Sequence, residues 1–397
     1  MIASKFVLAL FAAVSVATPI DEQSALLLKH SEVSSPPEFA SRPELFQLHK
    51  DLIQVSSLSR HEENITAFLS SYLAKQGLNV EFLDSPVGGK NIYGYFGKNK
   101  NASVLLTSHI DTVPPFFNYS LKRGPDNQLK IHGRGSTDAK ASVASQIIAA
   151  KELFAEGKIN GDDVSFLYVV GEEIGGLGMV PADKQLIKEN VGWETVIFGE
   201  PTANTLAVGH KGIYYFQIKV FGRSCHSGYP ELGVDANKAL IGIMNELLTT
   251  AFPGSELLGN TTVNIGEIDA TNAANVLSPY AACTVLIRAA STIDKTAAVV
   301  NQIITKYEKE AIRIEIKMTQ EADPTYVDYD VPGFNHTSLS CSTDVPNMQN
   351  RGFKRYLYGP GLITIAHSAN EYILPEMLEQ GVDDYKTLVL HALNSRI

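Results

Sequence analysis

Three short apolar runs, each ending in a turn that carries a histidine or a glutamate, constrain the fold of this chain most strongly. They cover residues 104–107, 164–170 and 195–198. An apolar run followed by turn residues is typical of a buried strand that ends at a loop. Parallel strands of an open α/β sheet end at one edge, where such folds place their chemistry. We therefore predict a mixed, mostly parallel sheet with helices on both faces.

The turns after these strands carry side chains that can bind a metal. His109 and Asp111 are two residues apart, so on an extended strand they leave the same face. A carboxylate there can fix one ring nitrogen while the other binds a metal. Glu172 and Glu173 would repel one another unless a cation lies beside them, and Glu200 follows the third strand. The ordinary alternatives are a core histidine paired with a turn aspartate, and solvated glutamates; the coincidence of all three strands favours a metal.

A glycine-rich turn before a predicted helix, 141–156, adds Asp138 to these candidates. The turn reads GRGSTDAK. It lacks the GxxxxGK[ST] order of a phosphate loop, which argues against nucleotide binding. At a helix start the ordinary role of an aspartate is N-capping, but a short, rigidly held carboxylate also suits a metal ligand.

Length and composition limit the function classes. A chain of 397 residues exceeds one ordinary domain, so two domains are expected. Apolar residues make up 44%, enough for a sizeable core, and the formal net charge is −10. A nucleic-acid partner would need clustered lysine and arginine, so it is excluded.

The pattern of hydrophobic residues changes after residue 207. Lys211–Phe221 alternates as a half-exposed antiparallel strand does, and Asp235–Thr249 reads as an amphipathic helix capped by Asp235. Two further strands, a helix and a last strand follow, which predicts a small α+β sandwich at residues 208–318. We expect residues 214–221 to form an exposed edge strand that supports a homodimer, with a monomer as the alternative.

The inserted sandwich interrupts the larger domain, which carries the candidate metal ligands. This domain is expected to comprise residues 41–207 and 319–397, with a helix start at residues 340–345 and a closing helix at 382–393.

The N-terminus reads as a secretory signal. Residues 6–16 are apolar, too short for a stable membrane span, and small residues follow. We predict a signal peptide at 1–17, a leader or pro-segment at 18–40 and no membrane anchor. Five sequons support a glycoprotein that is secreted or, alternatively, retained in the vacuole or another secretory compartment. They lie at Asn64, Asn101, Asn118, Asn260 and Asn335.

The three cysteines are too few for a disulfide framework. They are Cys225, Cys283 and Cys341. One disulfide with one free thiol and three buried thiols are both consistent with the sequence, and a catalytic cysteine is not expected.

Six ordered motifs carry a family resemblance. They read SHIDTVPP, GRGSTDAK, GEEIGG, GEPT, GRSCHSG, and GPG followed by AHSANEY. Their order resembles that of a co-catalytic zinc metallopeptidase family. This family includes acetylornithine deacetylase, succinyl-diaminopimelate desuccinylase, aminoacylase and the glutamate and Gly-X carboxypeptidases. The likeness covers roughly residues 43–395, and the chain looks like a secreted, fungal-type carboxypeptidase member.

The resemblance implies five ligands for two Zn²⁺ ions per subunit, for which Co²⁺ or Mn²⁺ can substitute. Asp138 bridges the ions, with His109 and Glu200 on one and Glu173 and His367 on the other. In this family the peptide bond after the bridging aspartate is often cis.

The same resemblance implies roles around the metals. Glu172 is the general base, and Asp111 supports His109. His226, from the inserted domain, steadies the developing oxyanion; a turn histidine without a role is its alternative. Substrate binding falls to Arg288, Asn275 and Gly361. For Arg288 the alternative is a surface ion pair.

One departure from the family pattern concerns the segment after Lys140, where Ala141 and Ser142 replace the usual glycines. We expect altered helix packing there and no loss of metal.

The predicted function is a secreted di-zinc exopeptidase that hydrolyses an amide bond next to a free carboxylate, with the inserted domain closing over the site. An N-acyl-amino-acid amidohydrolase, such as a deacetylase, is the first alternative. A non-catalytic glycoprotein with the same fold is the second. The preferred substrate side chain cannot be read from the residues.

Overall fold

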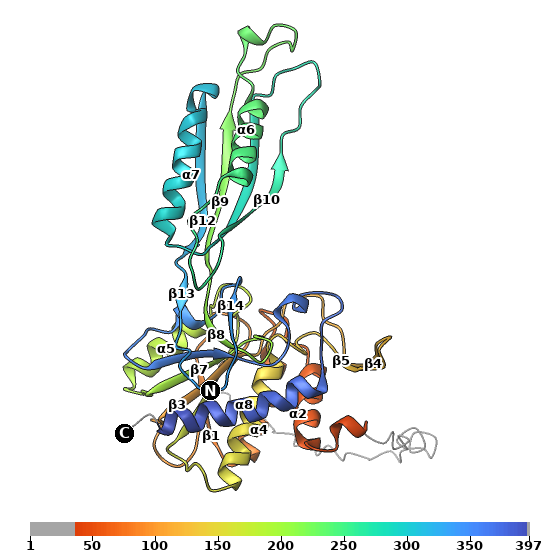
Figure 1. Ribbon diagram of the computed structural model, residues 1–397, viewed down its shortest axis with the longest axis vertical. Helices are drawn as coiled ribbons and strands as arrows, with labels where there is room; N and C mark the ends of the chain where they lie inside the picture. Colours follow the sequence, from red (N-terminus) through yellow and green to blue (C-terminus); the bar gives the residue numbers. More distant parts are fainter. Residues whose placement is uncertain (1–35, 395–397) are drawn as a thin grey trace, which may run out of the picture. The chain divides into compact units, whose positions relative to one another are not determined.

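The computed structural model describes residues 36–394. The predicted signal peptide, 1–17, and residues 18–35 of the predicted leader lie outside this range. The chain divides into two compact units, residues 1–41 and 42–397. The described part of the first unit holds one short 3-10 helix, Pro37–Phe39. The remaining elements belong to the second unit (Figure 1).

A six-stranded mixed sheet contains the three predicted buried strands. Its order is β1-β2-β6-β3-β7-β15. The strands are β1 (Asn79–Leu83), β2 (Asn91–Tyr95), β3 (Val104–His109), β6 (Val164–Val169), β7 (Thr195–Gly199) and β15 (Lys354–Tyr358). β6, β3, β7 and β15 are parallel neighbours, whereas β2 pairs antiparallel with both β1 and β6. The prediction of a mixed, mostly parallel sheet is therefore confirmed.

Helices cover both faces of this sheet because its central strands are apolar on both sides. Every residue of β3, β6 and β7 is buried. α5 (Met179–Lys188) packs into a core cluster with residues of β3, β6, β7 and β15. α4 (Lys140–Ala155) and α8 (Pro375–Asn394) both contact β3 and pack against each other. The buried Tyr385 of α8 donates a hydrogen bond to the Tyr358 carbonyl at 2.7 Å.

Two helices precede the sheet in sequence, and of the two helices predicted near the C-terminus only the closing one forms. α2 spans Pro43–Gln54 and α3 spans Glu63–Lys75, with Gly77 at φ +88° just beyond it. α8 is confirmed but begins earlier, at Pro375. The predicted helix start at 340–345 is wrong: only a short 3-10 turn forms, at Val345–Asn347, where Pro346 supplies no backbone N–H.

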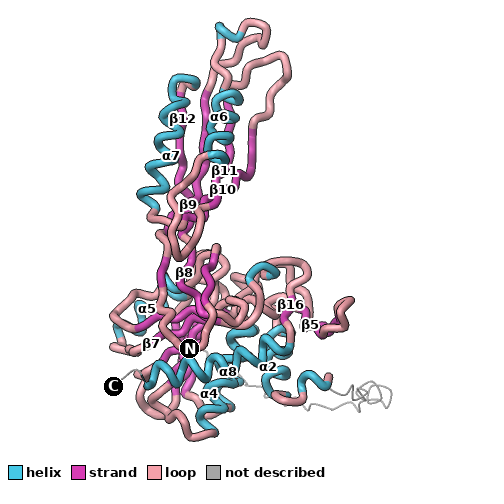
Figure 2. Tube along the Cα trace, in the orientation of Figure 1, coloured by secondary structure: helices cyan, strands magenta, loops and turns pink. Residues whose placement is uncertain are grey.

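A second, four-stranded antiparallel sheet lies in the inserted segment, with order β10-β11-β9-β12. The strands are β9 (Gly212–Phe221), β10 (Thr262–Asp269), β11 (Tyr280–Ala289) and β12 (Arg313–Ala322). α6 (Ala236–Thr249) and α7 (Ile293–Tyr307) share one core cluster with this sheet (Figures 1 and 2). Asp235 caps α6 as predicted, since its side chain accepts the Asn237 N–H at 3.1 Å.

The expectation that residues 214–221 form an exposed edge strand is wrong. They belong to β9, which pairs with β11 on one side and with β12 on the other. The alternation along β9 reflects one face packed on the helices and one face partly exposed. The edges of this sheet are β10 and β12.

Two three-stranded sheets complete the fold. One has the order β13-β8-β14 and the other β16-β5-β4. Their strands are β4 (Ser120–Arg123), β5 (Leu129–His132), β8 (Leu206–His210), β13 (Thr325–Tyr326), β14 (His336–Leu339) and β16 (Tyr372–Ile373). Within residues 36–394, none of the helices combines the length and apolarity that a bilayer crossing requires.

Each of the three cysteines is a free thiol. Only Cys283 is buried, whereas Cys225 and Cys341 are partly exposed. The alternative with a disulfide therefore does not hold in this structure, and neither does the alternative with three buried thiols.

Candidate metal and catalytic site

The predicted metal ligands gather at the carboxyl edge of the six-stranded sheet. β6, β3 and β7 are parallel neighbours, so their ends lie together. His109 is the last residue of β3, Glu173 lies in the turn after β6, and Glu200 directly follows β7. The edge therefore collects three of the five predicted ligands from segments far apart in the sequence.

A first group of three ligand atoms forms around His109. Its Nε2 atom lies 3.0 Å from Asp138 Oδ1 and 3.9 Å from Glu200 Oε2. The three side chains offer one atom each within 4.8 Å of one another. All three residues are buried, with exposed fractions of 2%, 5% and 7% for His109, Asp138 and Glu200.

A second group forms around His367 and shares Asp138 with the first. His367 Nε2 lies 3.2 Å from Asp138 Oδ2 and 2.9 Å from Glu173 Oε2. These three side chains also offer ligand atoms within 4.8 Å of one another. The two oxygens of Asp138 thus face different histidines, which is the arrangement that a bridging carboxylate requires. The Asp138–Ala139 peptide bond is cis, as the resemblance implies.

The electrostatics of the two groups suit divalent cations. Burial raises the pKa of Glu200 and of Glu173. Hydrogen bonds with Asp138 and Glu173 raise the pKa of His367 to about 10. These shifts mean that Glu173, Glu200 and His367 hold protons more readily unless other positive charge lies beside them. Imidazole nitrogens with carboxylate oxygens are a donor set that zinc accepts, so the residues fit a metal.

Asp111 lies against His109, as the resemblance implies, and its carboxylate also holds the turn after β6. His109 Nδ1 donates to the backbone carbonyl of Asp111 at 3.0 Å, and the carboxylate is farther, at 3.5 Å. The Asp111 carboxylate accepts the N–H groups of Glu172 and Glu173 at 3.1 and 3.3 Å. Ser59 Oγ also donates to it at 2.8 Å. Asp111 therefore fixes the turn that carries the two glutamates.

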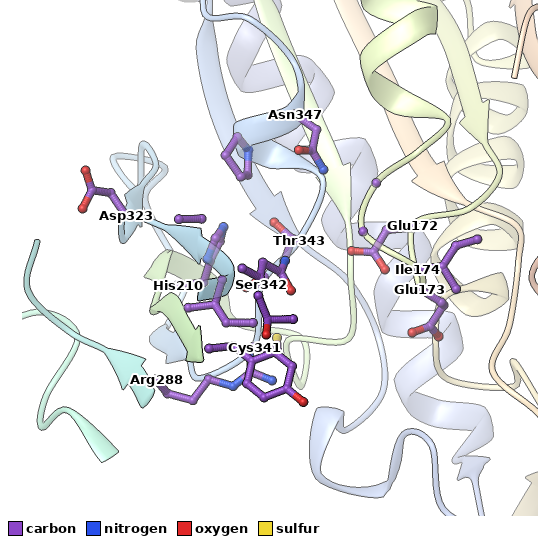
Figure 3. Close-up of a pocket in the computed structure, with 18 of the residues that line it drawn as sticks. Glu172, Glu173, Ile174, His210, Arg288, Asp323, Cys341, Ser342, Thr343 and Asn347 are labelled. Carbon is purple, nitrogen blue, oxygen red and sulfur yellow. The ribbon is translucent and has the colours of Figure 1, made fainter. Parts of the chain in front are cut away.

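A cavity of about 530 Å³ opens beside the second ligand group. Glu172, Glu173 and His367 line it, and so does Arg288 of β11. Figure 3 shows Glu172 and Glu173 on one side of the cavity and Arg288 with Cys341 on the other. Burial, followed by the charge of Glu200, raises the pKa of Glu172. A carboxyl with a raised pKa at the wall of a cavity is a candidate proton-transfer group.

Three predicted residues do not line this cavity. His226 and Asn275 are exposed and belong to neighbouring loops, where the Ser227 N–H donates to the Asn275 carbonyl at 2.9 Å. Gly361, at φ +93°, packs against Thr137, because a Cβ atom there would lie 2.8 Å from Thr137 Cγ2. Gly361 thus shapes the segment before Asp138. The predicted roles of His226 and Asn275 stay predictions.

The structure adds cavity residues that the sequence interpretation missed. His210, at the end of β8, is buried and lines the cavity, and its Nδ1 atom bonds the Lys211 carbonyl at 3.0 Å. Asn347 lines it too and donates to Asp344 at 2.8 Å. His210 falls between the quoted motifs, so no spacing signal marks it. Asn347 follows a serine- and threonine-rich segment that was interpreted as a helix start.

Lys140 is buried at the start of α4 and explains the local helix packing. Its Nζ atom donates to the carbonyls of Leu52 and Val55, both at 2.9 Å, at the end of α2. Burial lowers the pKa of Lys140 to about 7. The lysine therefore ties α2 to the segment that follows Asp138.

His49 of α2 gives a pH prediction. Its Nε2 atom donates to the Ser136 carbonyl at 2.9 Å, and burial lowers its pKa from 6.5 to about 4. Between these values the unfolded chain binds more protons than the folded one, so stability falls as the pH drops from 6.5 to 4. At pH 4 we expect the burial of His49 to lower the free energy of unfolding by about 3 kcal/mol relative to pH 7.

Denaturant unfolding at pH 7 and pH 4.5 of the wild type and of His49→Gln measures this loss. Glutamine keeps an amide donor for Ser136 but does not titrate. The variant should lose less stability on acidification than the wild type. An equal loss in the two proteins would show that His49 is not the group responsible.

Comparisons with known proteins agree with this geometry. The sequence model of the peptidase family M20/M25/M40 matches residues 105–391 of this chain. A Peptidase M20 domain-containing protein of Schizosaccharomyces pombe is 41% identical over 377 residues, covering 94% of this chain and 90% of that protein. A probable carboxypeptidase of Emericella nidulans is 36% identical over 421 residues, covering 98% of each chain. The crystal structure of a tripeptidase from Staphylococcus aureus shares the fold, with a TM-score of 0.74 at 19% identity over 89% of this chain and 98% of that one.

Proposed function

This chain belongs to the peptidase family M20/M25/M40 and is a metallopeptidase, and on that premise we propose that it is a di-zinc exopeptidase of the carboxypeptidase type. It would hydrolyse the amide bond next to a free carboxylate. The observation that carries the proposal is the sharing of Asp138 by two ligand groups, one of which borders a cavity with Glu172 and Arg288. The naming of the Emericella nidulans relative as a probable carboxypeptidase supports the same activity.

In this proposal each ion has three protein ligands. His109, Asp138 and Glu200 would hold one, and Asp138, Glu173 and His367 the other. Two divalent ions would supply Lewis acidity for activating water and polarising the scissile carbonyl. Zinc is the metal proposed because its usual donors are present; Co²⁺ and Mn²⁺ accept similar donors.

Glu172 would move the proton in the hydrolytic step. It takes a proton from the attacking water as the carbon–oxygen bond forms. It then gives that proton to the amide nitrogen as the carbon–nitrogen bond breaks, so the products are an amine and a carboxylic acid, which then ionises by releasing its own proton. Its raised pKa supports the role of base, because a carboxylate with a raised pKa accepts a proton from water more readily.

Arg288 would bind the free carboxylate of the substrate, since a guanidinium can pair with a carboxylate through two parallel hydrogen bonds. We expect Arg288→Met to raise KM for a dipeptide about 10- to 100-fold, because the variant loses one charged hydrogen-bonded pair with the substrate. The same variant should change little the affinity for the C-terminal amide of that dipeptide, which binds without being cleaved. Steady-state kinetics on the dipeptide, with the amide added as a competitive inhibitor, measure the difference. Arg313→Met is the matched control, because Arg313 pairs with Glu315 on β12 and does not line the cavity.

A substrate panel with and without a chelator tests the proposed function as a whole. The panel contains unblocked dipeptides, N-blocked dipeptides, their C-terminal amides, and N-acetyl amino acids. An exopeptidase of the carboxypeptidase type cleaves the N-blocked dipeptides and not the amides. Faster turnover of N-acetyl amino acids than of any dipeptide would establish the amidohydrolase alternative. No turnover, together with no bound metal, would establish the non-catalytic alternative.

We further propose that the protein passes through the secretory route as a glycoprotein, in a secreted or vacuolar location. The predicted signal peptide supports this proposal. All five sequon asparagines are exposed, so an oligosaccharide can reach each of them. They are Asn64, Asn101, Asn118, Asn260 and Asn335.

We propose that two copies of the chain form a homodimer through β10 and α6 of the inserted segment. β10 is an edge strand, and its Ile268 is 58% exposed. On α6, Ile241 and Leu248 are 60% and 59% exposed, although both are large and apolar. An unpaired strand edge with exposed apolar side chains is suited to pairing with a second copy. The molar mass in solution decides between dimer and monomer.

A further inference from the structure

A buried ion pair lies directly behind the bridging aspartate. Arg134 Nη1 and Glu371 Oε2 are 2.6 Å apart, and both side chains are 1% exposed. A buried charge is costly unless it is paired and hydrogen-bonded. Such a pair beside a proposed metal site calls for a specific role, and its other contacts indicate which.

Glu371 holds the backbone that carries Asp138. Its Oε1 atom accepts the N–H groups of Thr137 and Asp138, both at 3.1 Å. Thr137 Oγ1 also donates to the Tyr372 carbonyl at 2.7 Å, beside Glu371. The bridging ligand is thus fixed from behind by a carboxylate that none of the ligand groups uses.

Arg134 extends the same connection to the second histidine. Its Nη2 atom donates to the His367 carbonyl at 3.4 Å, and its Nε atom donates to the Pro115 carbonyl at 3.3 Å. β16 pairs with β5, with Tyr372 opposite His132, so the segments that carry the two residues lie side by side. His367 itself adopts φ +62°, a conformation that a non-glycine residue keeps only when its surroundings hold it.

We propose that Glu371 and Arg134 are positioning residues that clamp Asp138 and His367 together, so that the second ligand group is formed before any metal arrives. The inference rests on the proposed di-metal function. Residues that orient ligands from outside the ligand set typically change metal affinity 10- to 100-fold when they are replaced. The clamp contacts both Asp138 and His367 but not His109 or Glu200. The ion held by Asp138, Glu173 and His367 should therefore weaken most.

The first test replaces Glu371 with glutamine and measures metal binding directly. Metal-free protein is titrated with Zn²⁺ against a competing chelator, and the bound ions are counted. In Glu371→Gln we expect the ion of Asp138, Glu173 and His367 to bind about 10- to 100-fold more weakly, and the ion that the clamp reaches only through Asp138 to weaken less. The variant should then retain one ion at a chelator concentration where the wild type retains two.

A second variant and a matched control separate positioning from stability. Glu371→Asp keeps the charge but shortens the side chain, so it should fold and show a smaller loss of the same ion. Asp183→Asn is the control, because Asp183 is also a buried acid that pairs with an arginine. It lies 3.4 Å from Arg351, and it accepts the Gln349 N–H at 2.9 Å. This variant should lower thermal stability without changing the affinity for either ion.

These outcomes distinguish a failure of the proposed positioning role from a failure of the proposed di-metal function. A wild type that binds two ions while Glu371→Gln and Glu371→Asp bind both equally well would overturn the clamp alone. Equal weakening in Asp183→Asn would overturn it as well, since general loss of stability would then explain the effect. A wild type that binds no metal would overturn the clamp and the proposed function together.

Discussion

Replacing Glu172 with glutamine should reduce kcat by at least about 10³-fold, within the range that general acid–base catalysis contributes, while both ions stay bound. Glutamine has nearly the shape of glutamate but cannot take a proton from water. Glu172 belongs to neither ligand group, although it lines the cavity beside Glu173. Metal analysis of the same preparation that is used for kinetics measures both quantities at once.

Asp183→Asn is the control for Glu172→Gln, because burial raises the pKa of Asp183 too, and it does not line the cavity. Its activity should stay close to that of the wild type. If the kcat of Glu172→Gln falls less than about tenfold, the loss is smaller than the smallest effect typical of a general base. Glu172 would then not be the base. If it loses metal, the residue acts on the ligands instead.

Replacing Asp138 with asparagine should remove both ions and reduce kcat/KM by more than about 10³-fold, which corresponds to roughly 4 kcal/mol of lost transition-state stabilisation. Asp138 offers a different oxygen to each histidine, 3.0 Å from His109 and 3.2 Å from His367. An amide has one oxygen and no charge, so it cannot bridge two cations as a carboxylate does.

His367→Ala is the informative comparison for Asp138→Asn. His367 belongs to one ligand group only, so its loss should release one ion and leave the other bound. Zinc counted by elemental analysis should therefore fall from two per chain to one in His367→Ala and to none in Asp138→Asn. Equal losses in the two variants would show that Asp138 is not shared.

The carboxyl edge of the sheet could be predicted because local pattern determines it. β3, β6 and β7 are short, wholly buried and mostly apolar, and each ends at a turn, which is a signal carried within a few residues. That signal places His109, Glu173 and Glu200 near one another through the parallel arrangement alone. His367 is different, because it follows a 3-10 turn, Ile363–Ile365, and no apolar strand leads to it. Only the family resemblance indicated it.

What could not be predicted depends on pairing between distant segments. The alternation in β9 shows that one face of the strand is covered, but it does not show which strands pair with it. An edge strand and a central strand can therefore have the same sequence pattern. Glu371 lies inside a quoted motif, four residues after His367. Its contact with Asp138 joins residues 233 apart in the sequence, which no local spacing reveals. The N–H groups that it accepts become visible only in three dimensions.

The most direct measurement is the crystallographic location of bound metal by anomalous scattering, in protein supplied with Zn²⁺ after its own metal has been stripped. Two peaks are predicted per chain. One should lie among His109, Asp138 and Glu200, and the other among Asp138, Glu173 and His367. A fully active enzyme with no peak at these side chains, or with a single peak that Asp138 does not touch, would contradict the account.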